Sequence, residues 1–373
     1  MLLSNTVALH APTHQSLELA TISATAYNGR NIGPRQAAAD SRDSAMIVVT
    51  GGAGFIGSNL VAALAARGIT DVAVVDRFRD GEKWQNLAKR EVATLVPPEQ
   101  TLAFLDQHAA EIDTVFHLGA VSATTERDVD KIVANNVALT LDLWRWCSWR
   151  GCRLIYASSA ATYGDGSAGF DDDGSCDGLA RLRPLNAYGW SKHLVDRRIA
   201  RAVAGGDLVP PQWVGLKFFN VYGPNETHKG DMMSVVAKLH PQLTAGNPAR
   251  LFKSHRDGFE DGGQLRDFIH VDDCVAVMLW LYDHAEVSGL FNVGTGKARS
   301  FKDLALATFS ALGLPPRIEY FDMPEHLRGK YQYFTQATTD RLRAAGFDQP
   351  FTELEEGVRR YVQDFLSQPD PYR

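Results

Sequence analysis

The sequence predicts an α/β fold in which a doubly wound parallel sheet is joined to a smaller C-terminal α/β domain. Three observations lead to this prediction. Short apolar runs alternate with helical segments, a glycine-rich turn separates the first run from the first helix, and loop residues become frequent after Val221. Repeated strand–helix units imply a parallel sheet with helices on both faces. The loops carried by such a scaffold are where binding residues concentrate.

The expected strands are short and apolar. Met46–Thr50 is rich in β-branched residues, and Val72–Asp76 has the unbroken apolar run of a strand buried on both faces. Further strands are expected at Thr114–Leu118, Arg153–Ala157, Gln212–Phe219 and Leu290–Val293. Helices are expected at Ser58–Arg67, Trp190–Ala204 and Cys274–Tyr282, and the tail Phe301–Phe365 is predicted to be mostly helical. Loops are predicted around Pro224, Pro241, Pro248 and Asp257–Gly263.

A glycine-rich turn directly follows the first strand. Gly51, Gly54 and Gly57 have GxxGxxG spacing, and Asp76 ends the next strand 19 residues beyond Gly57. Glycine allows a tight turn and lets the backbone approach a pyrophosphate, which the amino end of the following helix then binds. The pattern predicts a Rossmann-type dinucleotide site.

These elements divide the chain into three parts. Residues 46–220 are predicted to form the Rossmann-type NAD(P)-binding domain, with its sheet completed by about 265–295. Residues 221–264 and 296–373 are predicted to form the substrate-binding region. Residues 1–45 have no sustained period and are predicted to be a disordered N-terminal extension; an ordered element and a targeting peptide are the alternatives.

The composition argues against several classes of protein. The 373 residues carry a formal net charge of -6, which disfavours general nucleic-acid binding. No apolar run approaches the ~18 residues that span a membrane. The 4 cysteines form no Cys-x-x-Cys pair, so neither a zinc site nor a thioredoxin-like site is expected. Reduced cysteines and the lack of a signal-peptide pattern predict a cytoplasmic enzyme without a metal.

Tyr188 and Lys192 form a YxxxK pair, which shares one face if the segment is helical. An ammonium group beside a phenol lowers the pKa of the phenol, so that tyrosinate can act as a base. Ser158 and Ser159 follow the strand that begins at Arg153 and are expected at the carboxyl edge of the sheet, where ligands bind. A serine hydroxyl, a tyrosine base and a lysine together make a site that oxidises a carbinol.

Four motifs, in this order, resemble those of the extended short-chain dehydrogenase/reductase family. They are GGAGFIG (51–57), YASSAATYG (156–164), YGWSK (188–192) and FFNVYGP (218–224), and the resemblance covers about residues 46–365. Within the family, four further segments resemble the ADP-L-glycero-D-manno-heptose 6-epimerases: FHLGAVSATTE (116–126), HKGDM (228–232), RDF (266–268) and KYQYFTQ (330–336). The resemblance implies an isomerase that inverts C6 of an ADP-heptose for lipopolysaccharide inner-core synthesis.

The resemblance also implies roles for individual residues. Tyr188 and Lys229 would be alternative acid/base groups, Ser159 their hydroxyl partner and Lys192 the lysine on the cofactor side. Cofactor contacts are implied for Phe55, Ile56, Asp76, Arg77, Lys83, Leu118, Gly119, Ala120, Val121, Ser122 and Asn135, besides the three glycines. Substrate contacts are implied for Ser159, Asn220, Val221, Asp231, Lys238, Phe252, Lys253, Ser254, His255, Arg266 and Tyr331. The family further implies a homo-oligomer, pentameric among the heptose epimerases.

A second acid/base group suits an epimerase. Removal of hydride gives a planar ketone, and return of hydride to the opposite face inverts the centre. If the intermediate turns about the bond to its ring, its oxygen occupies two positions, which one base cannot serve. Lys229 would need a pKa lowered by burial or by a nearby cation such as charged His228. A phosphate contact is the alternative role for Lys229.

Several positions depart from the family pattern. Arg77 stands where Asn is more usual, Leu118 where Glu is, Asp231 where Ser is and Lys238 where His is. These departures bear on cofactor preference and substrate contacts. Asp76 at a strand end favours NAD, whereas Arg77, Lys83 and the family favour NADP, so NADP is expected with NAD as the alternative.

Alternatives stay open for single residues and for the function. Arg266 is expected on a diphosphate, or in an ion pair with Asp267 or Asp272, and Tyr331 could instead pack in the core. His117 is expected to be structural. The rival functions are a UDP-hexose 4-epimerase and a non-catalytic NAD(P)-binding protein. The intact YxxxK pair disfavours the second of these. A dehydratase is disfavoured because Ser159 is followed by two alanines, not by an Asp–Glu pair.

Overall fold

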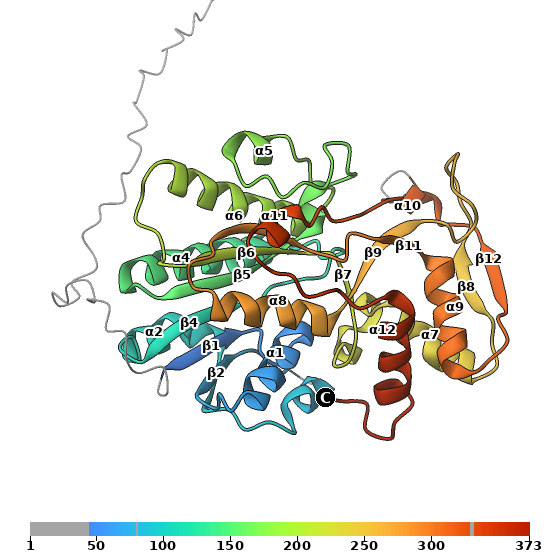
Figure 1. Cartoon of the computed structure of the whole chain (residues 1–373), viewed down its shortest axis with the longest axis horizontal. Coiled ribbons are helices and arrows are strands. Elements are labelled where there is room, and N and C mark those ends of the chain that lie inside the picture. The colour runs from blue at the N-terminus through green and yellow to red at the C-terminus, as the bar shows by residue number, and fades with distance from the viewer. Residues whose placement is uncertain (1–44, 80, 329–331) are drawn as a thin grey trace, which may run out of the picture. The chain divides into compact units, whose positions relative to one another are not determined.

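The computed structural model describes residues 45–79, 81–328 and 332–373, so the extension predicted at 1–45 lies outside the described residues except for its last one. A seven-stranded parallel sheet has the order β10-β6-β5-β4-β1-β2-β3 (Figure 1). Its strands are β1 (Met46–Thr50), β2 (Val72–Val75), β3 (Thr94–Val96), β4 (Ile112–His117), β5 (Arg153–Ser159), β6 (Trp213–Phe218) and β10 (Gly289–Val293). The predicted α/β class with a doubly wound parallel sheet is confirmed.

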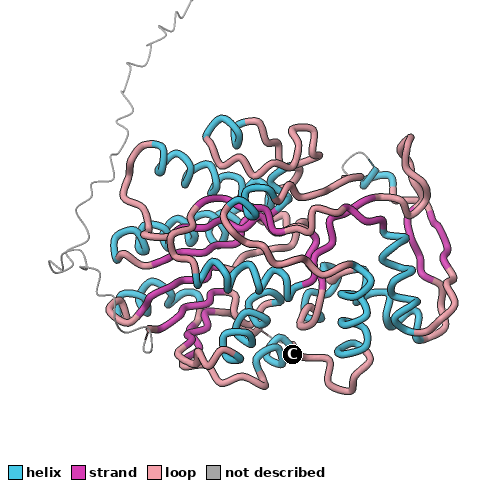
Figure 2. The backbone as a smooth tube through the Cα atoms, viewed as in Figure 1, coloured by secondary structure: helices cyan, strands magenta, loops and turns pink. Residues whose placement is uncertain are grey.

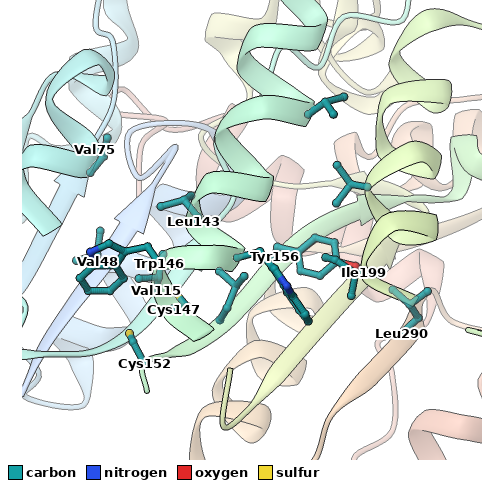
Figure 3. Packing of buried hydrophobic residues seen from close by; sticks show 14 of the residues in the cluster. Val48, Val75, Val115, Leu143, Trp146, Cys147, Cys152, Tyr156, Ile199 and Leu290 are labelled. Carbon is teal, nitrogen blue, oxygen red and sulfur yellow. The ribbon is translucent and has the colours of Figure 1, made fainter. Parts of the chain in front are cut away.

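Helices cover both faces of this sheet, as Figure 2 shows. One face packs against α1 (Phe55–Ala66) and α8 (Val271–Asp283), and the other against α4 (Leu139–Arg150) and α6 (Ala187–Ala204). Alternate residues of a strand point to opposite faces, so Val48 joins one core and Val49 the other. Figure 3 shows the core that holds Val48, with Val115 of β4 beside Leu143 of α4 and, further along, Ile199 of α6. Burial on both faces explains the unbroken apolar runs.

A second group of elements lies beyond the carboxyl ends of β6 and β10. β7 (Asn220–Tyr222), β9 (Leu265–His270) and β11 (Ala298–Ser300) form a three-stranded sheet, and β8 (Ala249–Phe252) pairs with β12 (Ile318–Phe321). The helices α7 (Val235–Thr244), α9 (Phe301–Leu312) and α12 (Leu354–Tyr361) contribute to the apolar clusters there. Of the predicted 265–295 stretch, β10 completes the seven-stranded sheet, whereas β9 belongs to the smaller one.

The remaining elements are short. They are α2 (Thr101–Gln107), α3 (Val129–Ile132), α5 (Cys176–Ala180), α10 (Glu325–Arg328) and α11 (Asp340–Ala344). There are also short 3-10 helices, η2 (Glu82–Leu87), η3 (Pro98–Gln100), η5 (Ala160–Tyr163) and η6 (Thr227–Met232), and short π-helices, η4 (Val133–Ala138) and η7 (Val362–Leu366). Within the described ranges, no helix is long and apolar enough to cross a membrane.

Two local predictions were wrong. Pro241, taken as a sign of a loop, lies inside α7, where apolar packing of Val236, Leu239 and Leu243 maintains the helix around it. The tail is less helical than predicted, because β12, irregular stretches and only the short helices α10 and α11 lie between α9 and α12. β12 forms there because its chain pairs with β8, a partner about 70 residues away in sequence.

Candidate active site

The turn after β1 and the first turn of α1 each have one position with room only for glycine. Gly51 adopts φ +71°, and a Cβ added there would meet the backbone of Gly119 at 2.6 Å. A Cβ at Gly57 would lie 2.1 Å from the carbonyl oxygen of Gly51. Helix α1 then starts at Phe55 without a side-chain cap and without an acidic residue in its first turn. These residues fit a dinucleotide, since an uncapped helix start and a side-chain-free turn leave amides for a pyrophosphate.

Asp76, Arg77 and Lys83 lie together just beyond β2. The Asp76 carboxylate accepts hydrogen bonds from the Ala53 amide at 2.9 Å, from the Arg77 amide at 2.7 Å and from Lys83 Nζ at 2.5 Å. The Arg77 guanidinium is exposed and forms an ion pair with Glu99. A carboxylate suits ribose hydroxyls, while the two cations suit a 2′-phosphate.

The segment Leu118–Ser122 follows β4 and borders the glycine turn. The Gly119 amide donates to Thr50 Oγ1 at 3.1 Å, and the predicted cofactor residues of this segment are half-buried apart from exposed Ser122. The neighbouring His117 is buried between Thr50 and Thr140, and burial lowers its pKa to about 3. A neutral imidazole between two hydroxyls fits the structural role expected for His117.

Asn136 is a residue that the sequence interpretation missed. Its side chain accepts from the Val121 amide at 2.8 Å and donates to the Val121 carbonyl and to Ser191 Oγ, which joins this segment to α6. The predicted neighbour, Asn135, instead donates to the Lys131 carbonyl at 2.8 Å. Both lie in the π-helical turn η4, which changes the face each residue presents. A regular helical period therefore could not choose between the two asparagines.

The Ser159 hydroxyl, at the end of β5, is hydrogen-bonded to Tyr188 near the start of α6, and Lys192 lies one turn further along that helix. Helix α6 begins after Asn186, whose side chain accepts from the Gly189 amide at 2.8 Å. Burial raises the pKa of Tyr188, and the neighbouring Ser159 hydroxyl partly opposes this rise. Burial lowers the pKa of Lys192 to about 8, against the attraction of Asp196. In the protein alone, burial thus outweighs the lowering of the phenol pKa expected from the YxxxK pair.

Lys229 occupies η6, on a different element from Tyr188. Its Nζ lies 5.0 Å from the ring centroid of Phe55, the first residue of α1, and burial lowers its pKa while Glu226 opposes the change. Burial also lowers the pKa of His228 to about 4, with Lys83 and Lys229 adding to this effect. His228 is therefore neutral at pH 7 and cannot be the cation that depresses the pKa of Lys229. Burial does this instead.

The predicted substrate residues lie in several places. Asn220 and Val221 belong to β7, and Lys238 donates from α7 to the Asp231 carbonyl at 2.5 Å. The Phe252 ring makes a tilted contact with the Phe321 ring, and Lys253 pairs with Asp322. The Ser254 hydroxyl donates to the Arg256 carbonyl, and His255 accepts from the Met323 amide. Phe252, Lys253 and His255 thus meet the segment around β12, whereas the Ser254 hydroxyl stays within its own loop. Tyr331 lies outside the described residues.

Arg266 is buried on β9 with its guanidinium over the ring of Phe301. The two carboxylates considered as its partners are engaged elsewhere. Asp267 accepts from the amides of Thr295, Gly296 and Ala337, and Asp272 pairs with Arg373.

Comparison with known proteins places the chain. The NAD dependent epimerase/dehydratase family matches residues 47–294. The ADP-L-glycero-D-manno-heptose-6-epimerase of Nitratidesulfovibrio vulgaris (strain DP4) is 50% identical over 332 residues, covering 88% of this chain and 100% of the relative. The Helicobacter pylori enzyme of that name has a similar structure, with a TM-score of 0.71, 27% identity and coverage of 86% and 96%. A Thermus thermophilus UDP-glucose 4-epimerase complex with NAD gives a TM-score of 0.64, 25% identity and coverage of 84% and 96%. The chain therefore belongs to the NAD dependent epimerase/dehydratase family.

Proposed function

We infer that the protein is an ADP-L-glycero-D-manno-heptose 6-epimerase. It interconverts ADP-D-glycero- and ADP-L-glycero-β-D-manno-heptose, precursors for the lipopolysaccharide inner core. The observation that carries this inference is the 50% identity to the Nitratidesulfovibrio epimerase over that relative's whole length. The grouping of Ser159, Tyr188 and Lys192 at the end of β5 supports it, because these groups suit oxidation of a carbinol.

A nicotinamide cofactor held at the glycine turn would supply hydride transfer at C6, and its oxidised form would bring a positive charge. We propose that Tyr188 takes the proton of the C6 hydroxyl and that Ser159 donates a hydrogen bond to the same oxygen. Lys192, 3% exposed, would hold the cofactor ribose and keep a positive charge beside the phenol. The phenolate needs this help because burial raises the pKa of Tyr188.

Lys229 is proposed as the second acid/base group, which serves the oxygen after the ketone has turned. Its half-buried side chain and lowered pKa support this role, since a lysine must lose its proton near pH 7 to act as a base. Its place over Phe55, at the start of α1, supports the alternative of a phosphate contact. Lys229→Met separates the two. An acid/base role predicts a lower kcat with bound cofactor unchanged, and a phosphate contact predicts a raised KM or cofactor loss at unchanged kcat.

NADP is proposed as the cofactor. Lys83 pairs with Asp76 and exposed Arg77 pairs with Glu99, so two cations lie just beyond β2, where a 2′-phosphate could exchange with these carboxylates. Competition between NADP and NAD for cofactor-free protein tests this preference. Tighter binding of NAD would leave the carboxylate of Asp76 as the deciding group.

The remaining site residues are proposed as substrate contacts. Arg266, buried on β9, would meet the diphosphate, because guanidinium matches phosphate oxygens. The other members of this set are Asn220, Val221, Asp231, Lys238, Phe252, Lys253, Ser254, His255 and Tyr331. A cytoplasmic homo-oligomer, pentameric as the resemblance implies, is also proposed. The four free cysteines suit a reducing compartment, and light scattering tests the assembly.

The deciding experiment is NMR of the purified protein with ADP-D-glycero-β-D-manno-heptose and no added cofactor. Conversion toward a mixture with the L-glycero epimer is expected, because a cofactor that is regenerated in each cycle stays bound. No conversion, even with added NADP or NAD, would overturn the heptose assignment. UDP-galactose and UDP-glucose would then test the rival 4-epimerase function.

A further inference from the structure

A buried ion pair lies directly beneath the proposed catalytic residues. Asp196 stands one helical turn beyond Lys192 on α6, and its carboxylate is 3.0 Å from Lys217 Nζ on β6. Both side chains are 0% exposed. Buried charges are costly unless geometry and hydrogen bonding are nearly complete, so a pair of this kind rarely lies in a core without a purpose.

The carboxylate of Asp196 joins α6 to β5. Ser158 Oγ donates to it at 2.7 Å and Tyr156 Oη at 3.1 Å, and both donors are buried residues of β5. Ser158 immediately precedes Ser159, the hydroxyl proposed to face the substrate oxygen. The helix that carries Tyr188 is therefore tied to the strand end that carries Ser159.

Lys217 ties the same strand end from the other side. Its Nζ donates to Thr162 Oγ1 at 2.8 Å, and that hydroxyl in turn donates to the Ser159 carbonyl at 2.8 Å. The ammonium also lies 4.8 Å from the ring centroid of Tyr163. Among the described residues, the side-chain hydrogen bonds that the pair makes with other residues thus lead to β5 or to η5, the turn that follows it.

We propose that Asp196 and Lys217 are positioning residues that hold Ser159 in register with Tyr188 and Lys192. The inference rests on the catalytic roles proposed above for those three residues. Neither Asp196 nor Lys217 touches the reacting atoms. They act by joining β5 and α6 through buried polar contacts, because apolar packing alone leaves small shifts inexpensive.

The test compares two paired substitutions on the same strand. Asp196→Asn with Lys217→Met removes the proposed anchor. Asp113→Asn with Arg153→Met removes the ion pair at the opposite end of β5, where Arg153 begins the strand. For each variant, kcat and KM for ADP-heptose are measured per cofactor-loaded site, so that loss of folded protein does not count as loss of rate.

The anchor variant is expected to lose about tenfold or more in kcat with KM changed by less than about twofold, because shifts of about 1 Å can cost on the order of 100-fold in rate. The control variant should keep both constants within about twofold. Equal kcat for the two variants would overturn the inference. If the anchor variant does not fold, Thr162→Val decides, since it cuts only the link from Lys217 to Ser159. An unchanged kcat in that variant then counts against the anchor.

Wild-type turnover in the same assay separates this inference from the proposed function. If the wild type does not convert ADP-heptose, the proposed function fails, and crystal structures of the two paired variants test the anchor without a substrate. The anchor predicts displacement of Ser159 relative to Tyr188 by more than about 0.5 Å in the first variant only. Unchanged positions in both variants would overturn it.

Discussion

Replacement of Lys192 by Met should stabilise the cofactor-free protein, although it removes a group proposed for catalysis. The lysine is only 3% exposed. Among the described residues, no ion pair joins its ammonium, and Asp196, the nearest acidic influence, already pairs with Lys217. Burial lowers the pKa of Lys192 from 10.5 to about 8, even though the attraction of Asp196 opposes this change. Methionine keeps the length of the apolar stem without the charge.

The magnitude follows from the pKa difference. An unfolded chain holds the proton at a pKa of 10.5 and the folded chain at about 8, so folding is penalised wherever the unfolded state binds more protons. At about 1.36 kcal/mol per unit, the penalty is about 3 kcal/mol at pH 7. It falls to about 2 kcal/mol at pH 9 and nearly vanishes above pH ~10.5. Wild-type stability should therefore rise with pH through this window relative to the variant.

Urea unfolding of cofactor-free wild type and Lys192→Met at pH 7 and pH 9 measures this difference. The variant is expected to exceed the wild type in free energy of unfolding by about 3 kcal/mol at pH 7, with the gap narrowing at pH 9. Lys302→Met, at an exposed position of α9, is the matched control and should show no gap. A variant equal to or less stable than wild type at pH 7 would refute the reasoning.

Three further predictions concern the glycine turn, the cofactor preference set by Lys83 and the proposed acid/base group Lys229. Gly57→Ala should weaken cofactor binding by about 100-fold or more, despite a helix-propensity gain of about 1 kcal/mol, because the added Cβ lies 2.1 Å from a carbonyl oxygen; Gly174→Ala, with ordinary contacts at 3.6 Å, should bind cofactor normally in the same titration. Lys83→Met should lower affinity for NADP about 10-fold to 100-fold more than affinity for NAD, as loss of a charge-assisted contact predicts; equal losses in a fluorescence titration would contradict the NADP proposal. In Glu226→Gln, the part of the pH–kcat profile that is set by deprotonation of Lys229 should move to lower pH, because the Glu226 charge raises the pKa of that lysine. A profile that does not move would argue against Lys229 as the base.

Patterns within short stretches predicted much of the fold. The strand expected at Gln212–Phe219 is Trp213–Phe218, and the glycine spacing predicted the turn whose close contacts require glycine. These predictions succeed because a strand buried on both faces and a turn without room for Cβ leave few residue types possible. The order of the motifs along the chain then identified the family before any contact was known.

What the sequence could not predict depends on contacts between distant segments. Asn136 was missed because η4 departs from the regular helical period, and Pro241 was misread because packing against other elements maintains α7. Asp196 and Lys217 are 21 residues apart, and their ion pair exists only because α6 packs on β5, whose neighbour β6 carries Lys217. Neither residue belongs to a motif, so nothing in the sequence marked them.

Burial shifts the pKa of Tyr188 and the pKa values of the two site lysines in opposite directions, and this difference orders their roles. It raises the pKa of Tyr188 and lowers the pKa values of Lys192 and Lys229, because low polarity disfavours whichever form is charged. The lysines are therefore closer to losing a proton at pH 7, while the phenol needs nearby positive charge to become a base. A bound oxidised nicotinamide would supply that charge and its reduction would remove it. Tyr188 is thus suited to accept a proton only during oxidation of the substrate, when the cofactor would be charged. Lys229 does not depend on that charge to lose its proton.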